Sequence, residues 1–150
     1  MELIVLTTHI NAPVEKCFDL SRNIDLHLDS MHQSKEKAID GKTAGLIEMG
    51  ESVTWLAKHF GISFRMTSQI TLMEKPLRFI DEMTNGPFKR LKHLHQFKVM
   101  DQVTEMTDVF EFEVPFGFVG WLVEKSFLKF YMKKLLMERN RFIKAFAEKS

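Results

Sequence analysis

The sequence predicts an α+β fold in which a curved, seven-stranded antiparallel sheet wraps around one long C-terminal helix. Between residues 51 and 114 several segments alternate apolar and polar side chains, as strands with one buried face do. Short polar or glycine-containing stretches separate these segments and are typical of turns. Residues 120–147 instead carry apolar side chains at helical spacing. The length of 150 residues suits a single domain, and we expect residues 1–150 to form it.

The N-terminal part of the chain predicts two short helices between two strands. Pro13 suits the first turn of a helix, and Glu15 lies near the positive end of that helix. Asn23 is a suitable N-cap for a second helix, because its side-chain oxygen can accept a hydrogen bond from the first turn. The expected elements are a strand over 3–10, helices over 11–22 and 24–31, and a strand over 35–40.

The middle of the chain predicts three more strands, over 51–58, 62–72 and 77–84. Residues two apart share a face of a sheet, so the apolar positions of each strand indicate its inward side. The residues expected to face inward are Val53, Trp55 and Ala57 in the first strand, and Ile62, Phe64, Met66, Ile70 and Leu72 in the second. The third strand is ambiguous, because Phe79 and Met83 favour the odd positions and Ile80 favours the even ones.

Two histidines in the next strand, RLKHLHQFKVM (90–100), have the same parity as its apolar residues and are expected to point inward. The following strand, VTEMTDVFEFEV (103–114), has apolar even positions, and Asp108 belongs to that inward set. A turn at 101–102 makes the two inward faces coincide. It pairs Val99 with Thr104, His95 with Asp108, and His93 with Phe110. We therefore expect a hydrogen bond between His95 and Asp108, whose Cβ atoms would lie about 5 Å apart.

The C-terminal segment predicts one helix over 120–147, with a broad apolar face. Trp121, Leu128, Leu135 and Phe142 recur every seven residues, and Met132 and Phe146 widen the stripe. At 1.5 Å per residue such a helix is about 40 Å long, enough to cross a small sheet. Lys and Arg outnumber Glu in this segment. We interpret them as a solvated outer face, while a basic amphipathic helix that contacts an anionic membrane stays open as the alternative.

Composition excludes several classes of function. Positive and negative charges nearly balance, with a net charge of +1, so nucleic-acid binding is not expected. The single Cys17 can form no internal disulfide, and no apolar leader follows Met1, so we expect a cytoplasmic protein. No apolar run approaches the ~20 residues of a membrane span. Phosphate loops and paired metal-binding cysteines are also absent from the sequence, and no cofactor is expected.

Several stretches resemble bacterial proteins of the SRPBCC superfamily, which includes START lipid-transfer domains, polyketide cyclase-like proteins and Bet v 1-like allergens. The matching stretches are INAPVEKCFDLSR, GESVTWLAKHFG, GPFKRLKHLHQF and TEMTDVFEFEVPFG, followed by the terminal helix, and together they span nearly the whole chain. The resemblance implies a helix-grip fold. It also implies that a hydrophobic ligand lies between the concave face of the sheet and the C-terminal helix.

His93, His95 and Asp108 are the residues most able to carry chemistry, and four roles stay open for them. They could form a self-satisfied buried network, or a polar anchor for a ligand that carries a carboxyl, hydroxyl or keto group. Two histidines and a carboxylate can also hold iron or zinc, although the glutamate spacing of a cupin is missing, and we expect no metal. A general acid or base is the fourth role, but no nucleophile accompanies it.

The function that the sequence favours is the binding, transport or sequestration of a small hydrophobic or amphipathic molecule. The expected ligand-binding residues are Trp55, Phe64, Met66, His93, His95, Asp108, Phe110, Leu128, Met132 and Leu135. One alternative is a cofactor-independent enzyme of the cyclase, aromatase or dehydratase kind, with catalytic residues that the sequence does not identify. Another is a module that binds a protein or a membrane surface. We expect a monomer or a weak homodimer.

Overall fold

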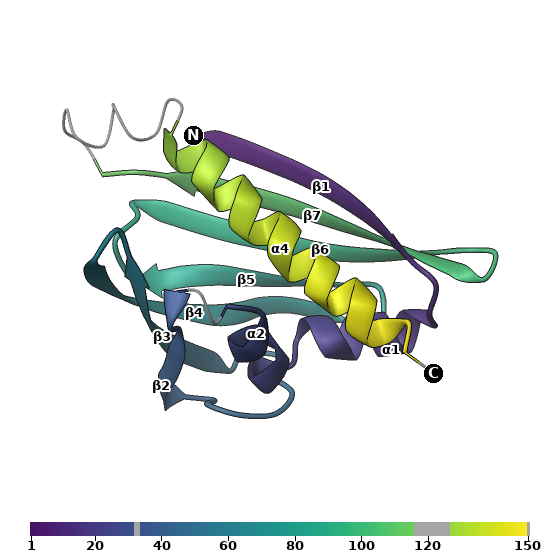
Figure 1. Ribbon diagram of the computed structural model, residues 1–150. Helices are drawn as coiled ribbons and strands as arrows, with labels where there is room; N and C mark the ends of the chain where they lie inside the picture. Colours follow the sequence, from purple (N-terminus) through teal and green to yellow (C-terminus); the bar gives the residue numbers. More distant parts are fainter. Residues whose placement is uncertain (32–33, 116–126, 150) are drawn as a thin grey trace.

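The computed structural model of the chain describes residues 1–31, 34–115 and 127–149 and has the predicted α+β architecture (Figure 1). One antiparallel sheet contains seven strands in the order β1-β7-β6-β5-β4-β3-β2. The strands are β1 (Glu2–Ile10), β2 (Lys37–Gly41), β3 (Ser52–His59), β4 (Ile62–Glu74), β5 (Arg78–Asn85), β6 (Arg90–Met100) and β7 (Val103–Glu113). The helices are α1 (Val14–Ser21), α2 (Ile24–Ser30) and α4 (Lys129–Ala147). The predicted fold class is confirmed.

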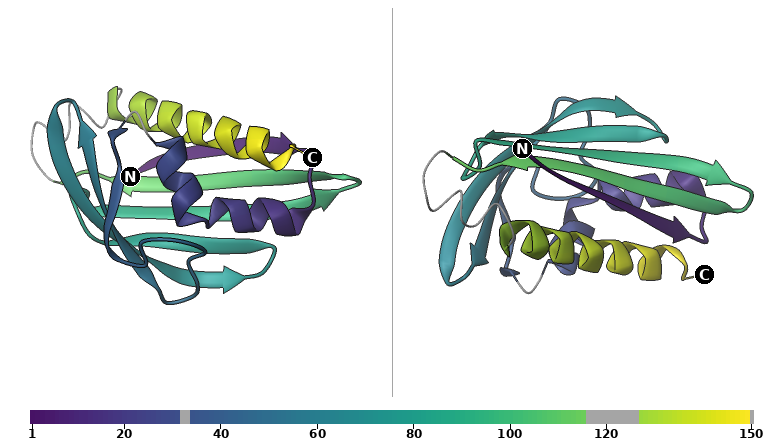
Figure 2. Two further views of the ribbon diagram at one scale, coloured as in Figure 1. Left: turned by 60° about the horizontal axis from the view of Figure 1, so that its bottom comes forward. Right: turned by 90° about the horizontal axis from the view of Figure 1, so that it is seen from above.

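The two short helices form within the predicted segments, although α1 begins at Val14, later than the predicted residue 11. Pro13 is the N-cap of α1. The Asn23 side chain accepts a hydrogen bond from the Leu26 amide at 3.1 Å and so caps α2, as predicted. Ile24 and Leu26 of α2 are buried in the same core cluster as Phe18 of α1. Both helices therefore pack on the concave side of the sheet, α1 near the C-terminal end of α4 and α2 closer to the middle of that helix (Figure 2).

Helix α4 crosses the concave face of the sheet diagonally (Figures 1 and 2). Its buried residues are Leu136, Arg139, Asn140, Ile143 and Ala147. The predicted stripe is therefore wrong at its C-terminal end, where Phe142 and Phe146 are 37% and 44% exposed. The reason is geometric, because a seven-residue repeat drifts by about 20° per heptad on a straight α-helix. Residues 120–126 of the predicted helix, with Trp121, lie outside the described residues.

Strand β4 departs from simple alternation. Its pairing with β5 shifts between Ile70 and Leu72, and beyond that irregularity Met73 lies opposite the buried Phe79. Met73 packs against the core in place of Leu72, so the predicted inward position of Leu72 is wrong. At the other end of β4, Ile62 is largely exposed, although it lies at the edge of the cavity described below. A bulge of this kind reverses the side-chain parity of the residues that follow it.

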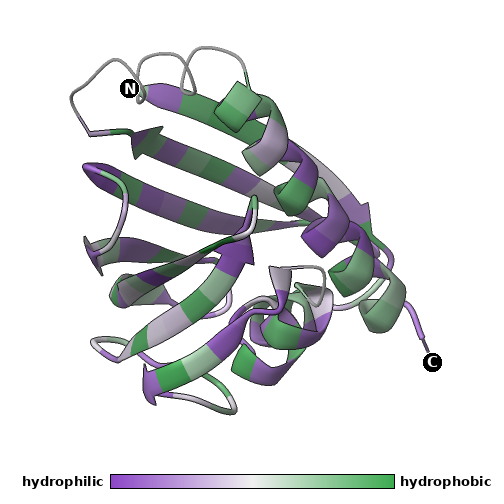
Figure 3. Cartoon of the chain, turned by 60° about the vertical axis from the view of Figure 1, so that its left-hand side comes forward, coloured by the Kyte–Doolittle hydropathy of each residue, from purple (hydrophilic) through white to green (hydrophobic). Residues whose placement is uncertain are grey.

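The core lies between the sheet and the helices that cover its concave side. Green apolar and purple polar residues alternate along the strands, as expected of strands with one buried face (Figure 3). One buried cluster joins α1 and α2 to the sheet, and a second lies under α4 around Phe110, Phe112 and Leu136. Phe79 of β5 belongs to the first cluster, which settles the ambiguous strand in favour of its odd positions. Among the described residues, no helix is long and apolar enough to cross a membrane.

Candidate ligand-binding site

A cavity of about 820 Å³ lies between the concave face of the sheet and α4. Strands β3 to β7 form one wall, and α4 forms the opposite wall with residues from the segments around α1 and α2. Most of the lining side chains are aromatic or aliphatic. Concave, largely apolar cavities of this size are typical sites for small molecules.

Nine of the ten sequence-predicted ligand-binding residues line this cavity. They are Trp55, Phe64, Met66, His93, His95, Phe110, Leu128, Met132 and Leu135. The tenth, Asp108, is fully buried beneath the two histidines and does not reach the cavity. The structure therefore brings the predicted residues together around one cavity. Asp108, however, contacts the histidines that line the cavity and does not line it itself.

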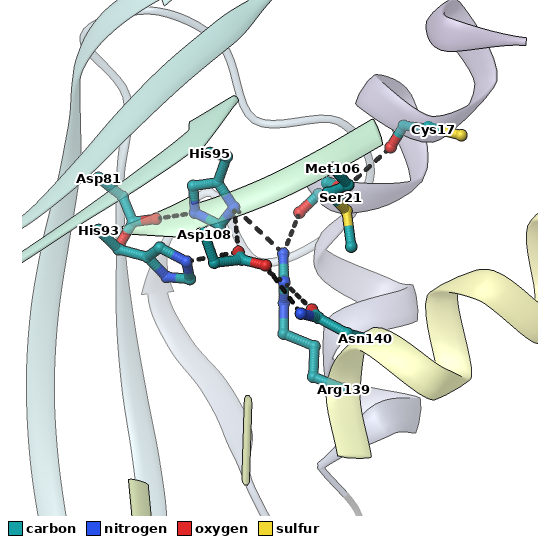
Figure 4. Close-up of polar contacts among 9 residues, drawn as sticks. All are labelled: Cys17, Ser21, Asp81, His93, His95, Met106, Asp108, Arg139 and Asn140. Carbon is teal, nitrogen blue, oxygen red and sulfur yellow. Dashed lines mark hydrogen bonds and ion pairs between the residues drawn. The ribbon is translucent and has the colours of Figure 1, made fainter. Parts of the chain in front are cut away.

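The β6–β7 register is the predicted one, with His95 opposite Asp108 and His93 opposite Phe110. The hydrogen bonds differ from the prediction. His93 Nε2 donates to Asp108 Oδ1 at 2.7 Å, while His95 Nε2 donates to Asp81 Oδ2 of β5 at 2.7 Å (Figure 4). The expected bond between His95 and Asp108 is not formed, because His95 Nδ1 lies 3.6 Å from Asp108 Oδ1.

The two histidine–carboxylate pairs cross each other diagonally. Asp81 lies opposite His93 and binds His95, whereas Asp108 lies opposite His95 and binds His93. The two imidazole rings stack, with centroids 3.7 Å apart and planes 25° apart. Diagonal neighbours on one face of a sheet are within reach of side chains as long as histidine. Strand β6 thus holds two parallel rings between carboxylates from the strands on either side.

Helix α4 completes the network with Arg139 and Asn140 (Figure 4). Asn140 Nδ2 donates to Asp108 Oδ2 at 2.7 Å. The Arg139 guanidinium donates to Asp108 Oδ1 at 3.4 Å, to the Ser21 carbonyl at 3.4 Å and to His95 Nδ1 at 3.3 Å. Because an arginine only donates, His95 Nδ1 must be an acceptor, which places the ring proton on Nε2. Two acceptors cannot bind each other, so His95 Nδ1 forms no hydrogen bond with Asp108.

Sequence reasoning missed Asp81, Arg139 and Asn140. Asp81 lies in the strand whose parity the sequence left open. The two α4 residues lie at helical spacing from Leu136 and Ile143, so the spacing of the buried face could have indicated them. The seven-residue apolar repeat instead indicated Leu128, Leu135 and Phe142 as the inward positions of the helix.

The network keeps its carboxylates ionised and His95 neutral. Burial alone would raise the pKa of Asp108, but the hydrogen bond from His93 and the charge of Arg139 hold it well below its ordinary value. Burial likewise opposes ionisation of Asp81, but the hydrogen bond from His95 and the charge of Arg139 together help to lower its pKa below the ordinary value. Burial lowers the pKa of His95 to about 4, although its bond to Asp81 opposes this. At neutral pH both carboxylates are therefore ionised, and the Arg139 cation contacts one of them, Asp108.

Two groups of the network remain open to the cavity. His93 Nε2 is bound to Asp108, while its Nδ1 has no hydrogen-bond partner among the described residues. Asp81 lines the cavity with 25% of its side chain exposed, and one of its oxygens is bound to His95. One donor atom each from Asp81, His93 and His95 lies within 4.8 Å of the others, a spacing that could suit a metal ion. The nearly parallel rings and the Arg139 cation disfavour that use, because ligand lone pairs must converge on a metal.

At the end of the cavity near the β3–β4 turn, aromatic side chains from this turn contact Tyr131 of α4 and Phe127, which precedes the helix. His59 Nδ1 lies 2.6 Å from the Tyr131 hydroxyl. The Phe60 ring lies 4.7 Å from the ring of Tyr131 and 5.4 Å from that of Phe127. Phe60 has a left-handed backbone, with φ of 55°, and its side chain is 55% exposed. We call Phe60, Phe127, Tyr131 and His59 the aromatic latch.

Comparisons with known proteins identify the fold. No family model and no curated protein matches the chain. A solved structure from Thermus thermophilus superposes with a TM-score of 0.76 at 16% identity, covering 98% of this chain and 100% of the other. A START superfamily protein from Mycobacterium smegmatis gives 0.69 at 12% identity, with 97% of both chains covered. Ginseng major latex-like protein 151 from Panax ginseng gives 0.66 at 12% identity, covering 99% of this chain and 98% of the other.

These structures share the curved sheet and the long C-terminal helix over nearly their whole length, as the coverage shows. At such low sequence identity the likeness concerns the fold alone, because one fold serves many functions. The implication that the SRPBCC resemblance carried for the architecture is confirmed. The chain has the helix-grip fold of START-type and latex-type proteins.

Proposed function

We propose that residues 1–150 form one domain that binds a small amphipathic molecule. The apolar body of this ligand would lie in the cavity, and its polar end would lie beside Asp81 and His93, which we call the floor of the cavity. The cavity itself is the observation that carries this proposal. Protein interiors are normally close-packed, and an unfilled apolar cavity lowers stability in proportion to its volume. A space of about 820 Å³ therefore needs an explanation other than imperfect packing, and an occupant supplies one.

The composition of the walls supports the same proposal. Met66 of β4 and Met132 of α4 line opposite walls of the cavity. Their flexible thioether side chains can adapt to ligands of different shape. Polar groups that are open to the cavity lie at the floor, near His93 and Asp81. An apolar volume with a few fixed polar groups is the usual design of a small-molecule site. The position agrees with the one that the family resemblance implies.

Titration with the neutral dye N-phenylnaphthylamine tests this function. We expect saturable fluorescence enhancement with micromolar affinity under native conditions. Leu135→Trp places a larger side chain in the cavity and should weaken binding by about tenfold. Leu3→Trp makes the same change at an exposed position of β1 and should leave the affinity unchanged. Enhancement that appears only when the protein begins to unfold would contradict the proposal.

A specific observation also favours a second candidate, cofactor-independent proton transfer. The Asp108 carboxylate fixes the His93 ring while Nδ1 faces the cavity, and a general base needs this kind of orientation. The enolisable ketone β-tetralone in deuterium oxide provides the test. Catalysis predicts that the protein accelerates deuterium exchange next to the carbonyl and that His93→Gln abolishes the acceleration. Exchange at the solvent rate, with the ketone bound, would rule the candidate out.

A further inference from the structure

The floor of the cavity presents hydrogen-bond acceptors to a ligand. Asp81 is ionised, so both of its oxygens can only accept, and His95 occupies one of them. His93 directs Nδ1 toward the cavity, since its Nε2–H is given to Asp108. The two side chains are neighbours: one carboxylate oxygen of Asp81 and one ring nitrogen of His93 lie within 4.8 Å of each other. A single donor group between them could therefore reach both acceptors.

The cations near the cavity are already engaged. Arg139 donates to Asp108, Asn140, Ser21 and His95. Arg22, which also lines the cavity, forms ion pairs at 2.8 Å with Asp19 and at 3.0 Å with Glu48, and it donates to the Ile47 carbonyl. Their guanidinium groups are held by protein acceptors. An anionic ligand would have to displace these bonds to be bound by either arginine.

The charges of the floor favour a cationic guest. Asp81 and Asp108 carry one negative charge each and Arg139 carries one positive charge, while His95 is neutral because burial lowers its pKa to about 4. Among the carboxylates and guanidinium groups of the network, two negative charges therefore meet one positive charge, and Asp81 is the carboxylate that lines the cavity. An uncompensated buried charge is costly, so a cation that enters the site is stabilised by it.

We propose that the cavity selects amphiphiles whose polar end is a protonated amine, bound between Asp81 and His93 Nδ1. This inference rests on the proposed function, and it names the chemical class of the ligand. An ammonium offers three N–H donors, of which two satisfy Asp81 and His93. A hydroxyl offers one donor and brings no charge. A carboxylate places a like charge beside Asp81 and offers no donor, so the carboxyl-bearing ligand that the sequence left open is disfavoured.

Calorimetric titration with decylamine, decanol and decanoate at neutral pH tests the proposal, because the three probes share one hydrocarbon chain. All are used below the concentration at which they form micelles. We expect decylamine to bind most tightly, decanol less tightly, and decanoate at least about tenfold more weakly than decylamine. The order, rather than any single affinity, carries the test.

A matched pair of variants assigns the selectivity to Asp81. Asp81→Asn keeps an oxygen that can accept from His95 and removes the charge, so it should weaken decylamine binding by about tenfold and change decanol binding little. Glu82→Gln removes one charge from the next residue of β5, on the opposite face of the sheet, and should change none of the three affinities. Should Asp81→Asn fail to fold, the order of the three probes on the wild-type protein still decides.

The outcomes separate this inference from the proposed function. Equal binding of all three probes supports a ligand cavity but overturns the selection of amines. Tightest binding of decanoate also overturns it, and shows that His93 Nδ1 acts as a donor. Binding of none of the probes overturns the proposed function and the inference together.

Discussion

Asp108 lies directly opposite His95 across the β6–β7 ladder, but its carboxylate accepts a hydrogen bond from His93, two residues away along β6. The same crossing occurs on the other side of β6, where Asp81 lies opposite His93 and binds His95. The stacked rings are thus held by carboxylates on two strands and by Arg139 and Asn140 on the helix. The network joins the sheet to α4 and forms the floor of the cavity.

A double-mutant cycle tests which histidine binds Asp108. Asp108→Leu leaves Arg139 as an unpaired buried charge and should cost about 3–5 kcal/mol of unfolding free energy. His93→Leu removes one donor and should cost about 1–3 kcal/mol. Because the two residues bond to each other, the double variant should lose less than the sum by about 1 kcal/mol or more, measured by urea unfolding. The cycle of Asp108→Leu with His95→Leu should show a smaller coupling.

The exposed pair of His9 and Glu105, 3.2 Å apart on the neighbouring ladder, is the control for this cycle. Surface pairs contribute about 0–1 kcal/mol, so its coupling should be near zero. Strict additivity of Asp108→Leu and His93→Leu would contradict the crossed arrangement.

Stability should fall as the solution is acidified from pH 6.5 toward pH 4. The pKa of His95 is 6.5 in its ordinary state and about 4 in the folded protein. Within this window the unfolded chain binds a proton that the folded chain rejects, so stability rises with pH. The lowered pKa of Asp81 and of Asp108 extends the loss to lower pH, since these carboxylates stabilise the fold only while ionised.

Urea midpoints measured across this range test that dependence. His95→Gln should flatten the slope between pH 6.5 and about 4, because glutamine does not titrate. His9→Gln, at a surface site, should leave the slope as it is. A wild-type stability that stays constant or rises on acidification through this range would contradict a neutral, buried His95.

The aromatic latch should control the rate of ligand exchange. Phe60→Ala removes ring contacts with Tyr131 and Phe127, and Tyr131→Phe removes the hydroxyl that meets His59. If the latch is closed in both the free and the bound protein, each change lowers the opening barrier by ~1 kcal/mol. Stopped-flow fluorescence with N-phenylnaphthylamine should then show association and dissociation both about fivefold faster, with unchanged affinity.

Phe130→Ala is the matched control for the latch, because this exposed ring lies beside Tyr131 in sequence without belonging to the latch. It should leave both rates unchanged. Rates that are the same in wild type, Phe60→Ala and Tyr131→Phe would show that the ligand enters elsewhere.

Local patterns in the sequence predicted most of the fold. The β6–β7 register followed from parity and a two-residue turn, and Asp101 indeed has the left-handed φ of 57° that such turns require. Register is strongly determined where one face is buried, because a slip of one residue would expose the whole apolar set. The Asn23 cap was equally local. These predictions needed only neighbouring residues and are confirmed.

Partners in the site could not be predicted in the same way. Arg139 meets Asp108 and His95 only after α4 has folded across the sheet, and sequence parity says nothing of that crossing. The choice of His93 over His95 by Asp108 depends on the tautomer that Arg139 imposes. Asp81 could not be assigned to the inward face, because the apolar residues of its strand favour both parities. In β4, the irregularity near Ile70 interrupts the alternation from which inward positions are predicted. Contacts distant in sequence therefore determine the chemistry of the floor.

The most direct test of a ligand cavity is an NMR titration of methyl-labelled methionine with N-phenylnaphthylamine. Met66 and Met132 line the cavity, whereas Met49 and Met100 are exposed outside it. We predict saturable shifts and intermolecular nuclear Overhauser effects at the methyl groups of Met66 and Met132, with the other two unchanged. Saturable binding that perturbs Met49 or Met100 and leaves Met66 and Met132 unaffected would contradict the account, as would the absence of binding.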